Sequence, residues 1–143
     1  MADTSLNENR IGLLIWQTSN LWQSNLRKKL SKYNISFNEY LIIETIYSLS
    51  NKSDNISQID IVYNSFIDKS VVSAKLSQLA KKKIIKKMTP NDNRSNRIIL
   101  TNEGTNIIES IIDDIILTEK NFFGKLNEET FNFINSLKLL LGK

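Results

Sequence analysis

The basic residues of this chain are concentrated in one stretch of its sequence. Residues 68–97 include nine lysines and arginines but only two acidic residues, so this stretch carries a net charge of +7 and the rest of the chain −3. The basic residues are Lys69, Lys75, Lys81, Lys82, Lys83, Lys86, Lys87, Arg94 and Arg97. A basic block in an otherwise acidic chain favours a polyanionic partner such as nucleic acid. A charged run is also typical of an ordinary solvated face.

The residue types on which most enzymatic chemistry depends are scarce. The chain has neither histidine nor cysteine, which excludes the usual nucleophile–base pairs and the imidazole and thiolate ligands of zinc or copper. Its four glycines do not form a phosphate-binding loop. Carboxylates remain for acid–base chemistry, and the densest group has the spacing of a solvated helix face. That group is Glu109, Asp113, Asp114 and Glu119. We therefore expect no enzymatic activity, no metal site and no cofactor.

The length of 143 residues suits one compact domain, or one domain with extensions for dimerisation. No apolar run approaches the roughly 18 to 20 residues that cross a bilayer. Residues 1–10 lack the basic and apolar regions of a secretory signal. The absence of cysteine is in keeping with a reducing compartment. We therefore expect a cytoplasmic protein without a membrane partner.

The first half of the chain is predicted to be helical. Apolar residues at helical spacing indicate a long first helix over residues 11–30. A second helix should begin at a capping box, in which Ser36 caps and Glu39 reaches back. Ser57 and Asp68 are placed to cap a third, short helix and a fourth, basic one.

The second half begins with a predicted β-hairpin. Short β-branched segments at 84–88 and 98–100 enclose a polar tip that contains the only proline of the chain. Thr101 is placed to cap a fifth helix, and a sixth should begin at Asn127. The sixth helix is expected to bury Phe131, Ile134, Leu137, Leu140 and Leu141. The predicted fold class is mainly α with a small β-hairpin wing.

Two short helices followed by a hairpin are typical of a winged helix-turn-helix. In that unit the second helix lies in the DNA major groove, and its N-terminal residues face base edges. Here those residues are Lys69, Ser70, Val71, Ser73, Ala74 and Lys75. Serine hydroxyls and the lysine amine suit bases or phosphates, and Val71 suits a thymine methyl group. An ordinary amphipathic helix with small polar residues outside would have the same pattern.

The hairpin and the start of the next helix resemble a known family. Residues 92–104 contain Asp92-x-Arg94, a strand, and then Leu100-Thr101-x-x-Gly104. This pattern resembles the wing of the MarR (multiple antibiotic resistance regulator) family, and the helix order resembles that family over the whole chain. The resemblance implies that Asp92 steadies Arg94, and that Arg94 enters a minor groove, where A·T-rich sequence concentrates negative potential.

Four positions depart from the pattern of the family. Val62 occupies a position where the family favours alanine, so we expect the two helices of the helix-turn-helix to be spaced slightly wider. Asn93 stands where a second arginine is common, and Ala74 stands where a basic residue is common, which puts some of the DNA contacts in question. Lys83 replaces the usual glycine after the recognition helix, so we expect that helix to end with a different cap. Ala74 and Asn93 keep an alternative open, namely a protein-interaction anti-regulator that has kept the fold and lost DNA binding.

The terminal helices have more apolar residues than one small domain needs. They could fill an intramolecular core, but the resemblance favours a homodimer in which residues 1–33 and 102–143 form dimerisation regions around a DNA-binding domain at 34–101. Such a dimer would bind double-stranded DNA at a pseudo-palindromic operator and act as a repressor of transcription. The resemblance also implies release by a small aromatic or anionic effector. Trp16, Trp22 and Tyr40 could line its pocket, although core packing is the interpretation we favour for all three.

Overall fold

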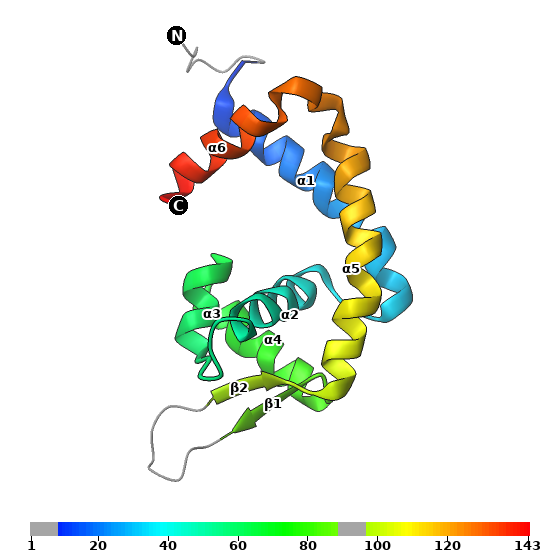
Figure 1. The fold of residues 1–143 in the computed structure, drawn as a ribbon, viewed down its shortest axis with the longest axis vertical. Helices are drawn as coiled ribbons and strands as arrows, with labels where there is room; N and C mark the ends of the chain where they lie inside the picture. Colours follow the sequence, from blue (N-terminus) through cyan, green and yellow to red (C-terminus); the bar gives the residue numbers. More distant parts are fainter. Residues whose placement is uncertain (1–8, 89–96) are drawn as a thin grey trace. The chain divides into compact units, whose positions relative to one another are not determined.

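The computed structural model describes residues 9–88 and 97–143. The chain forms two compact units (Figure 1). One consists of Arg27–Ile112, and the other combines Met1–Leu26 with Asp113–Lys143. We refer to them as the central unit and the terminal unit. No helix among the described residues is long and apolar enough to cross a membrane.

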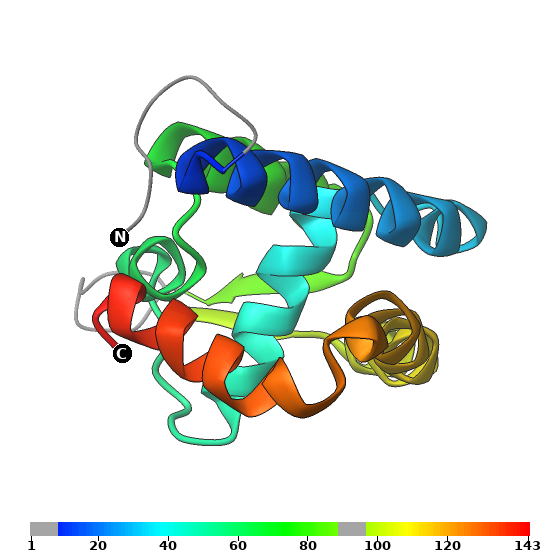
Figure 2. The same ribbon diagram turned by 90° about the horizontal axis from the view of Figure 1, so that it is seen from above.

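In the central unit, two helices lie against a two-stranded sheet and a third helix packs on those two. Helix α2 lies against α3, α4 and β2, and α2 crosses the hairpin in Figure 2. The elements are η1 (a 3-10 helix, Ser31–Tyr33), α2 (Phe37–Ser50), α3 (Gln58–Ser65), α4 (Lys69–Lys81), β1 (Ile85–Met88), β2 (Arg97–Leu100) and the first half of α5 (Asn102–Phe123). Their core is aliphatic apart from one tyrosine. It includes Tyr40, Ile42, Ile43, Ile46, Ile61, Val72, Leu76, Leu79 and Ile98, all at most 2% exposed.

The capping signals of the sequence set the starts of two helices. Ser36 accepts a hydrogen bond from the Glu39 N–H, and the Glu39 carboxylate accepts one from the Ser36 N–H at 2.9 Å. Ser57 makes the same reciprocal pair with Asp60 at the start of α3. These reciprocal bonds satisfy N–H groups that a helix leaves without intrahelical partners. The predicted caps at Ser36 and Ser57 are therefore confirmed.

The strands β1 and β2 are antiparallel, and Ile85 pairs with Leu100. The predicted hairpin is confirmed. The segment before α3 extends this pairing, because the Ile98 N–H donates to the Ile56 carbonyl at 2.8 Å. This contact was not predicted from the sequence. The hairpin is thereby bonded to the helix-turn-helix.

The terminal unit contains most of α1 (Ile11–Leu30), the end of α5, the 3-10 helix η2 (Gly124–Glu129) and α6 (Thr130–Leu141). The predicted start of the sixth helix at Asn127 was wrong. Asn127 has φ 47° and ψ −117°, which breaks the helix, and α6 begins three residues later. This pair of angles lies outside both the right-handed and the left-handed helical regions, so the helix cannot continue through Asn127.

Within the single chain, the predicted burial along α6 was also wrong. Leu137 is half-buried, but Phe131, Ile134, Leu140 and Leu141 are between 45% and 74% exposed. Among the described residues of the terminal unit, the exposed large apolar side chains are Ile11, Leu13, Leu14, Ile15, Trp16, Leu21, Ile116, Leu117, Phe131, Phe133, Ile134, Leu139, Leu140 and Leu141. So large an apolar surface is typical of a protein–protein interface.

Candidate nucleic-acid interface

The turn between α3 and α4 begins at a residue in an unusual conformation. Phe66 ends α3 with φ 61°, in the left-handed region, and its N–H donates to the Val62 carbonyl at 3.2 Å. A bulky side chain rarely takes this conformation. Two residues later Asp68 occupies the N-cap position of α4, but its side chain makes no capping hydrogen bond. The expectation that Asp68 caps this helix through its carboxylate was therefore wrong.

Helix α4 has one face in the core and one face outside. Val72, Leu76 and Leu79, spaced at i, i+4 and i+7, are fully buried. Of the side chains predicted to face DNA, four are exposed: Lys69, Ser70, Ser73 and Ala74. The other two are half-buried at the edge of that face: Val71 and Lys75. The amine of Lys75 donates to Gln78 Oε1 at 3.3 Å, so Lys75 is already engaged along its own helix.

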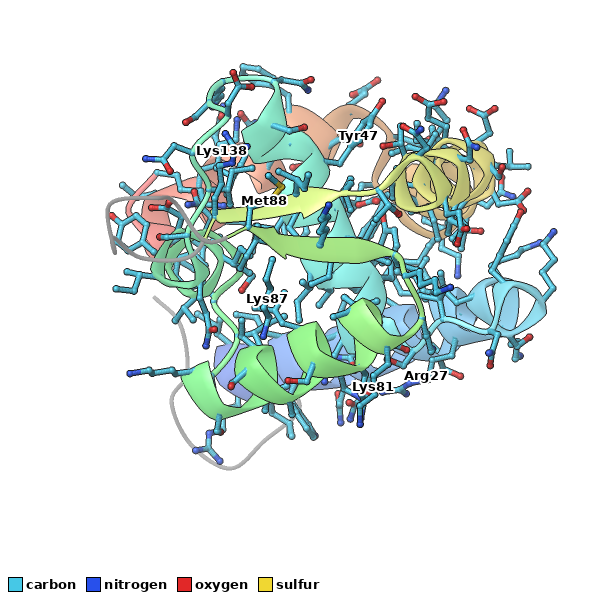
Figure 3. All side chains as sticks on the ribbon, turned by 90° about the horizontal axis from the view of Figure 1, so that it is seen from below. Arg27, Tyr47, Lys81, Lys87, Met88 and Lys138 are labelled. Carbon is cyan, nitrogen blue, oxygen red and sulfur yellow. The ribbon has the colours of Figure 1, made fainter. Side chains whose placement is uncertain are left out.

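Two further residues extend this outer face. Ser77 and Lys81 follow Ser73 at one and two helical turns, and both are exposed. Ser77 donates its hydroxyl to the Ser73 carbonyl at 3.2 Å. Figure 3 shows Lys81 at the end of α4 and Lys87 on β1. Neither residue was predicted to face DNA, although the helical spacing that starts at Ser73 leads on to both of them.

The exit of α4 is closed by a left-handed lysine. Lys83 has φ 61°, and its N–H donates to the Ala80 carbonyl at 3.0 Å. The Ile84 N–H donates to the Leu79 carbonyl, also at 3.0 Å. These two bonds form a Schellman motif, in which glycine is the usual left-handed residue. The expectation of a different cap was therefore wrong, because Lys83 adopts the conformation that glycine would take.

Thr101 and Gly104 join the hairpin to α5. The Thr101 hydroxyl lies 2.6 Å from the Lys83 carbonyl and 3.0 Å from the Ile84 carbonyl, and it accepts the Gly104 N–H at 3.0 Å. A Cβ atom on Gly104 would collide with the backbone oxygen of Ile84. The predicted cap at Thr101 is thus confirmed, and the structure shows that Gly104 lets α5 pack closely against the backbone of Ile84.

Lys82, between Lys81 and Lys83, is exposed as they are, but its amine contacts residues far away in the sequence. Its amine donates to Glu39 Oε1 at 3.1 Å and to the Asn34 carbonyl at 2.9 Å. Burial of Glu39 would raise the pKa of its carboxyl, but hydrogen bonds from Ser36 and Lys82, with the charge of Lys82, outweigh burial and lower that pKa. The carboxylate that caps α2 therefore stays ionised while it holds the end of α4.

The wing has basic residues on both of its strands. Lys86 and Lys87 are exposed on β1, and Arg97 is half-buried where β2 begins. The wing residues that the sequence analysis selected, Asp92 and Arg94, lie outside the described residues. Their roles stay predictions.

The aromatic residues considered for an effector pocket have different surroundings. Tyr40 is 2% exposed in the core of the central unit, as the core-packing interpretation predicted. Trp16 is 62% exposed, so the core-packing interpretation was wrong for Trp16 within the single chain. Trp22 lines a hollow of about 350 Å³ in the terminal unit, together with residues of α1 and α6.

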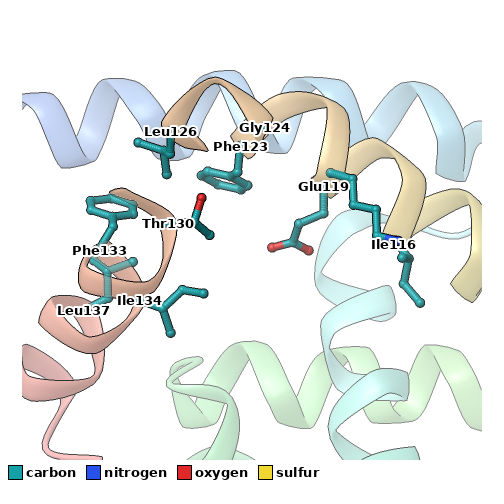
Figure 4. A pocket seen from close by; sticks show the side chains of 10 residues that line it. Ile116, Glu119, Phe123, Gly124, Leu126, Thr130, Phe133, Ile134 and Leu137 are labelled. Carbon is teal, nitrogen blue, oxygen red and sulfur yellow. The ribbon is translucent and has the colours of Figure 1, made fainter. Parts of the chain in front are cut away.

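A larger hollow of about 490 Å³ lies between the end of α5, η2 and α6 (Figure 4). Its wall is mostly apolar and includes Phe123, Phe133 and Leu137, which also line the hollow beside Trp22.

On α5, Glu109, Asp113 and Glu119 are exposed and Asp114 is half-buried. Over residues 9–88 and 97–143 no group of three or more acidic residues is arranged to hold a metal ion.

The order α3, turn, α4 and hairpin, with a polar and basic outer face on α4, defines a winged helix-turn-helix. No protein-family model matches the chain. Solved structures do share its fold. A MarR variant from E. coli in complex with operator DNA has a TM-score of 0.79 at 20% identity, over 92% of this chain and 93% of that one.

Two other structures extend the comparison. BpsR from Bordetella bronchiseptica, whose DNA binding is regulated by 6-hydroxynicotinic acid, has a TM-score of 0.85 at 16% identity, over 97% of each chain. A MarR-family transcriptional regulator from Silicibacter pomeroyi has a TM-score of 0.77 at 18% identity, over 99% of this chain and 93% of that one. The chain therefore has the fold of the MarR-family transcriptional regulators, as its wing sequence implied.

Proposed function

We propose that this protein is a sequence-specific, double-stranded DNA-binding regulator of transcription, and that it is a repressor rather than an enzyme. The observation that carries this proposal is the outer face of α4. Small polar and basic side chains are exposed there, while the opposite face is buried in the core. A helix presented in this way fits the major groove. The fold shared with regulators that bind DNA supports the same function.

The residues proposed to contact DNA are those of the N-terminal half of α4, with Arg94 of the wing. Lys69, Ser70 and Ser73 are exposed and can donate to phosphates or bases. Lys75 must leave Gln78 to reach a base. Arg94, steadied by Asp92, is proposed to enter the flanking minor groove.

We further propose that the protein binds DNA as a homodimer, with residues 34–101 as the DNA-binding domain and residues 1–33 and 102–143 in the dimerisation regions. The exposed apolar side chains of α1 and α6 support this assembly. A dimer would present two copies of α4 to a pseudo-palindromic operator, about 34 to 36 Å apart. Control by a small aromatic or anionic effector is a further proposal, supported by the regulation of BpsR.

Fluorescence anisotropy on a duplex selected from a random pool, and on a scrambled duplex, tests the proposed DNA contacts. Arg94→Ala should weaken binding to both duplexes. It should flatten the dependence of log affinity on log salt by about one to two units per dimer, at about 0.9 per lost phosphate contact. Lys75→Ala should instead relax preference at one position per half-site, by about 1 to 3 kcal/mol. Lys125→Ala, which removes the same charge from the terminal unit, is the matched control.

Wild-type affinity and salt dependence in Arg94→Ala would show that the wing does not touch DNA. If the wild-type protein bound no duplex at low salt, the alternative of a protein-interaction anti-regulator would replace the DNA-binding function. Ala74, at the centre of the exposed face, is the described residue that keeps this alternative under consideration.

A further inference from the structure

Lys82 belongs by sequence to a run of three lysines, but it differs from its neighbours in what it contacts. It is the C-cap residue of α4. Its amine lies 3.1 Å and 3.0 Å from the two carboxylate oxygens of Glu39, and 2.9 Å from the Asn34 carbonyl to which it donates. The amine has three protons to donate, and it donates to two protein acceptors, Glu39 Oε1 and the Asn34 carbonyl, while the Lys82 side chain stays partly exposed.

Glu39 is the buried partner in this arrangement. Only 3% of it is exposed, and its Oε1 also accepts the Ser36 N–H at 2.9 Å. Asn34 ends η1 in a left-handed conformation, with φ 57°. One lysine amine therefore connects the end of α4 to the cap of α2 and to the turn that precedes it.

We propose that Lys82 and Glu39 are positioning residues for DNA reading. In this role, which rests on the proposed DNA-binding function, their ion pair holds the axis of α4 against α2, and Lys82 does not contact a phosphate. The partners of Lys82 are supplied by the protein itself, and the charge that it would offer to DNA is balanced by Glu39.

The geometry of α4 shows why such a tether affects recognition. Its 13 residues span about 20 Å at about 1.5 Å per residue. A tilt of about 5° about one end would move the other by about 1.7 Å, which exceeds the roughly 0.5 Å within which a binding constellation must be held. The outer face carries the proposed base contacts, so a small tilt should reduce discrimination between sequences more than it reduces attraction to DNA.

The test compares Lys82→Gln, Glu39→Gln and the double variant with Lys81→Gln, which removes an exposed lysine from the adjacent position. Each is measured by fluorescence anisotropy on the selected duplex and on the scrambled one, at several salt concentrations. Glu39→Gln is the decisive variant. It makes the protein more positive, so electrostatics alone predicts tighter binding, whereas loss of positioning predicts weaker binding to the selected duplex.

We expect Lys82→Gln and Glu39→Gln each to lose about tenfold in affinity for the selected duplex, with little change on the scrambled duplex and an unchanged salt slope. The double variant should lose no more than either single one, and Lys82→Arg should keep most of the affinity. Lys81→Gln should weaken binding to both duplexes if Lys81 contacts a phosphate. Glutamine is itself accepted in a capping box, so Glu39→Gln keeps the test open if Lys82→Gln does not fold.

The proposal is overturned if Lys82→Gln flattens the salt slope by about two units per dimer and Glu39→Gln binds both duplexes more tightly, because Lys82 would then be a phosphate contact. The proposal would also be overturned if Lys82→Gln and Glu39→Gln each kept the wild-type ratio of affinities for the selected and the scrambled duplex. A wild-type protein that binds neither duplex would instead refute the proposed function, so the two failures are distinguishable.

Discussion

Replacement of Gly104 by alanine tests how the wing is joined to α5. An ideal Cβ at this position would overlap the carbonyl oxygen of Ile84, and it would also lie 3.1 Å from the carbonyl carbon and 3.2 Å from Cγ2 of that residue. The main obstacle is backbone, which cannot rotate away as the end of a side chain can. The first turn of α5 and the start of β1 must therefore separate.

The cost can be worked out from the contacts that this movement affects. Overpacking a tight contact costs about 1 to 3 kcal/mol. The hydrogen bond from the Thr101 N–H to the Ile84 carbonyl, now 3.0 Å long, would weaken, at a cost of about 1 kcal/mol. Alanine recovers up to about 1 kcal/mol of helix propensity. Gly104→Ala should therefore destabilise the protein by about 2 kcal/mol, or lower its Tm by about 6 °C.

Gly12→Ala is the matched control, because it makes the same substitution in a helix where nothing lies within 4 Å of the added Cβ. It should stabilise the protein slightly, by no more than about 1 kcal/mol. Both variants are compared with wild type by urea unfolding at equal protomer concentration, since a dimer's stability depends on concentration. If Gly104→Ala were as stable as Gly12→Ala, the contact between α5 and Ile84 would not be as tight as described.

Three further predictions concern the C-terminal end of α4, the buried Glu39 carboxylate and the proposed dimer. Lys83→Gly should raise the free energy of unfolding by about 0.5 to 1 kcal/mol, because the left-handed conformation costs a lysine more than a glycine; destabilisation in urea would show that the lysine side chain makes a compensating contact. The folded-state pKa of Glu39 is lowered below its ordinary value of 4.5, so its ionised form stabilises the fold above that pH, and this contribution is lost as the pH falls through the folded-state pKa. Glu39→Gln should accordingly lower the free energy of unfolding by about 1 to 2 kcal/mol at pH 7, a figure reduced for the partial exposure of Lys82. This loss should shrink in acid. A difference in unfolding free energy between variant and wild type that stays constant with pH would contradict the ion pair. In light scattering at micromolar concentration the wild type should have about twice the 16.5 kDa mass of one chain. Leu139→Asp, which changes a side chain that is 80% exposed in the single chain, should lower the measured mass toward that of the monomer. A monomeric wild type would refute the dimer.

Features that depend on a few neighbouring residues could be predicted from the sequence. The capping boxes at Ser36 and Ser57 need only a side chain and a backbone N–H three residues apart, and both are present. The hairpin and the Thr101 cap are also local, and both were predicted correctly. Asp68 shows the limit of this reasoning, because a residue type suited to capping does not ensure that the bond forms.

Long-range contacts decided the rest, because chain neighbours do not determine what an exposed-looking side chain meets after folding. Lys81, Lys82 and Lys83 are three consecutive lysines, so the sequence alone does not distinguish their roles. The fold leaves Lys81 on the outer face of α4, ties Lys82 to Glu39 43 positions earlier, and holds Lys83 in a left-handed turn. The sequence by itself determined the winged helix-turn-helix and its basic character, since both arise from periodicity, capping and composition. Only the tertiary structure decided that Lys82 binds acceptors within the protein, because those acceptors come from distant parts of the chain.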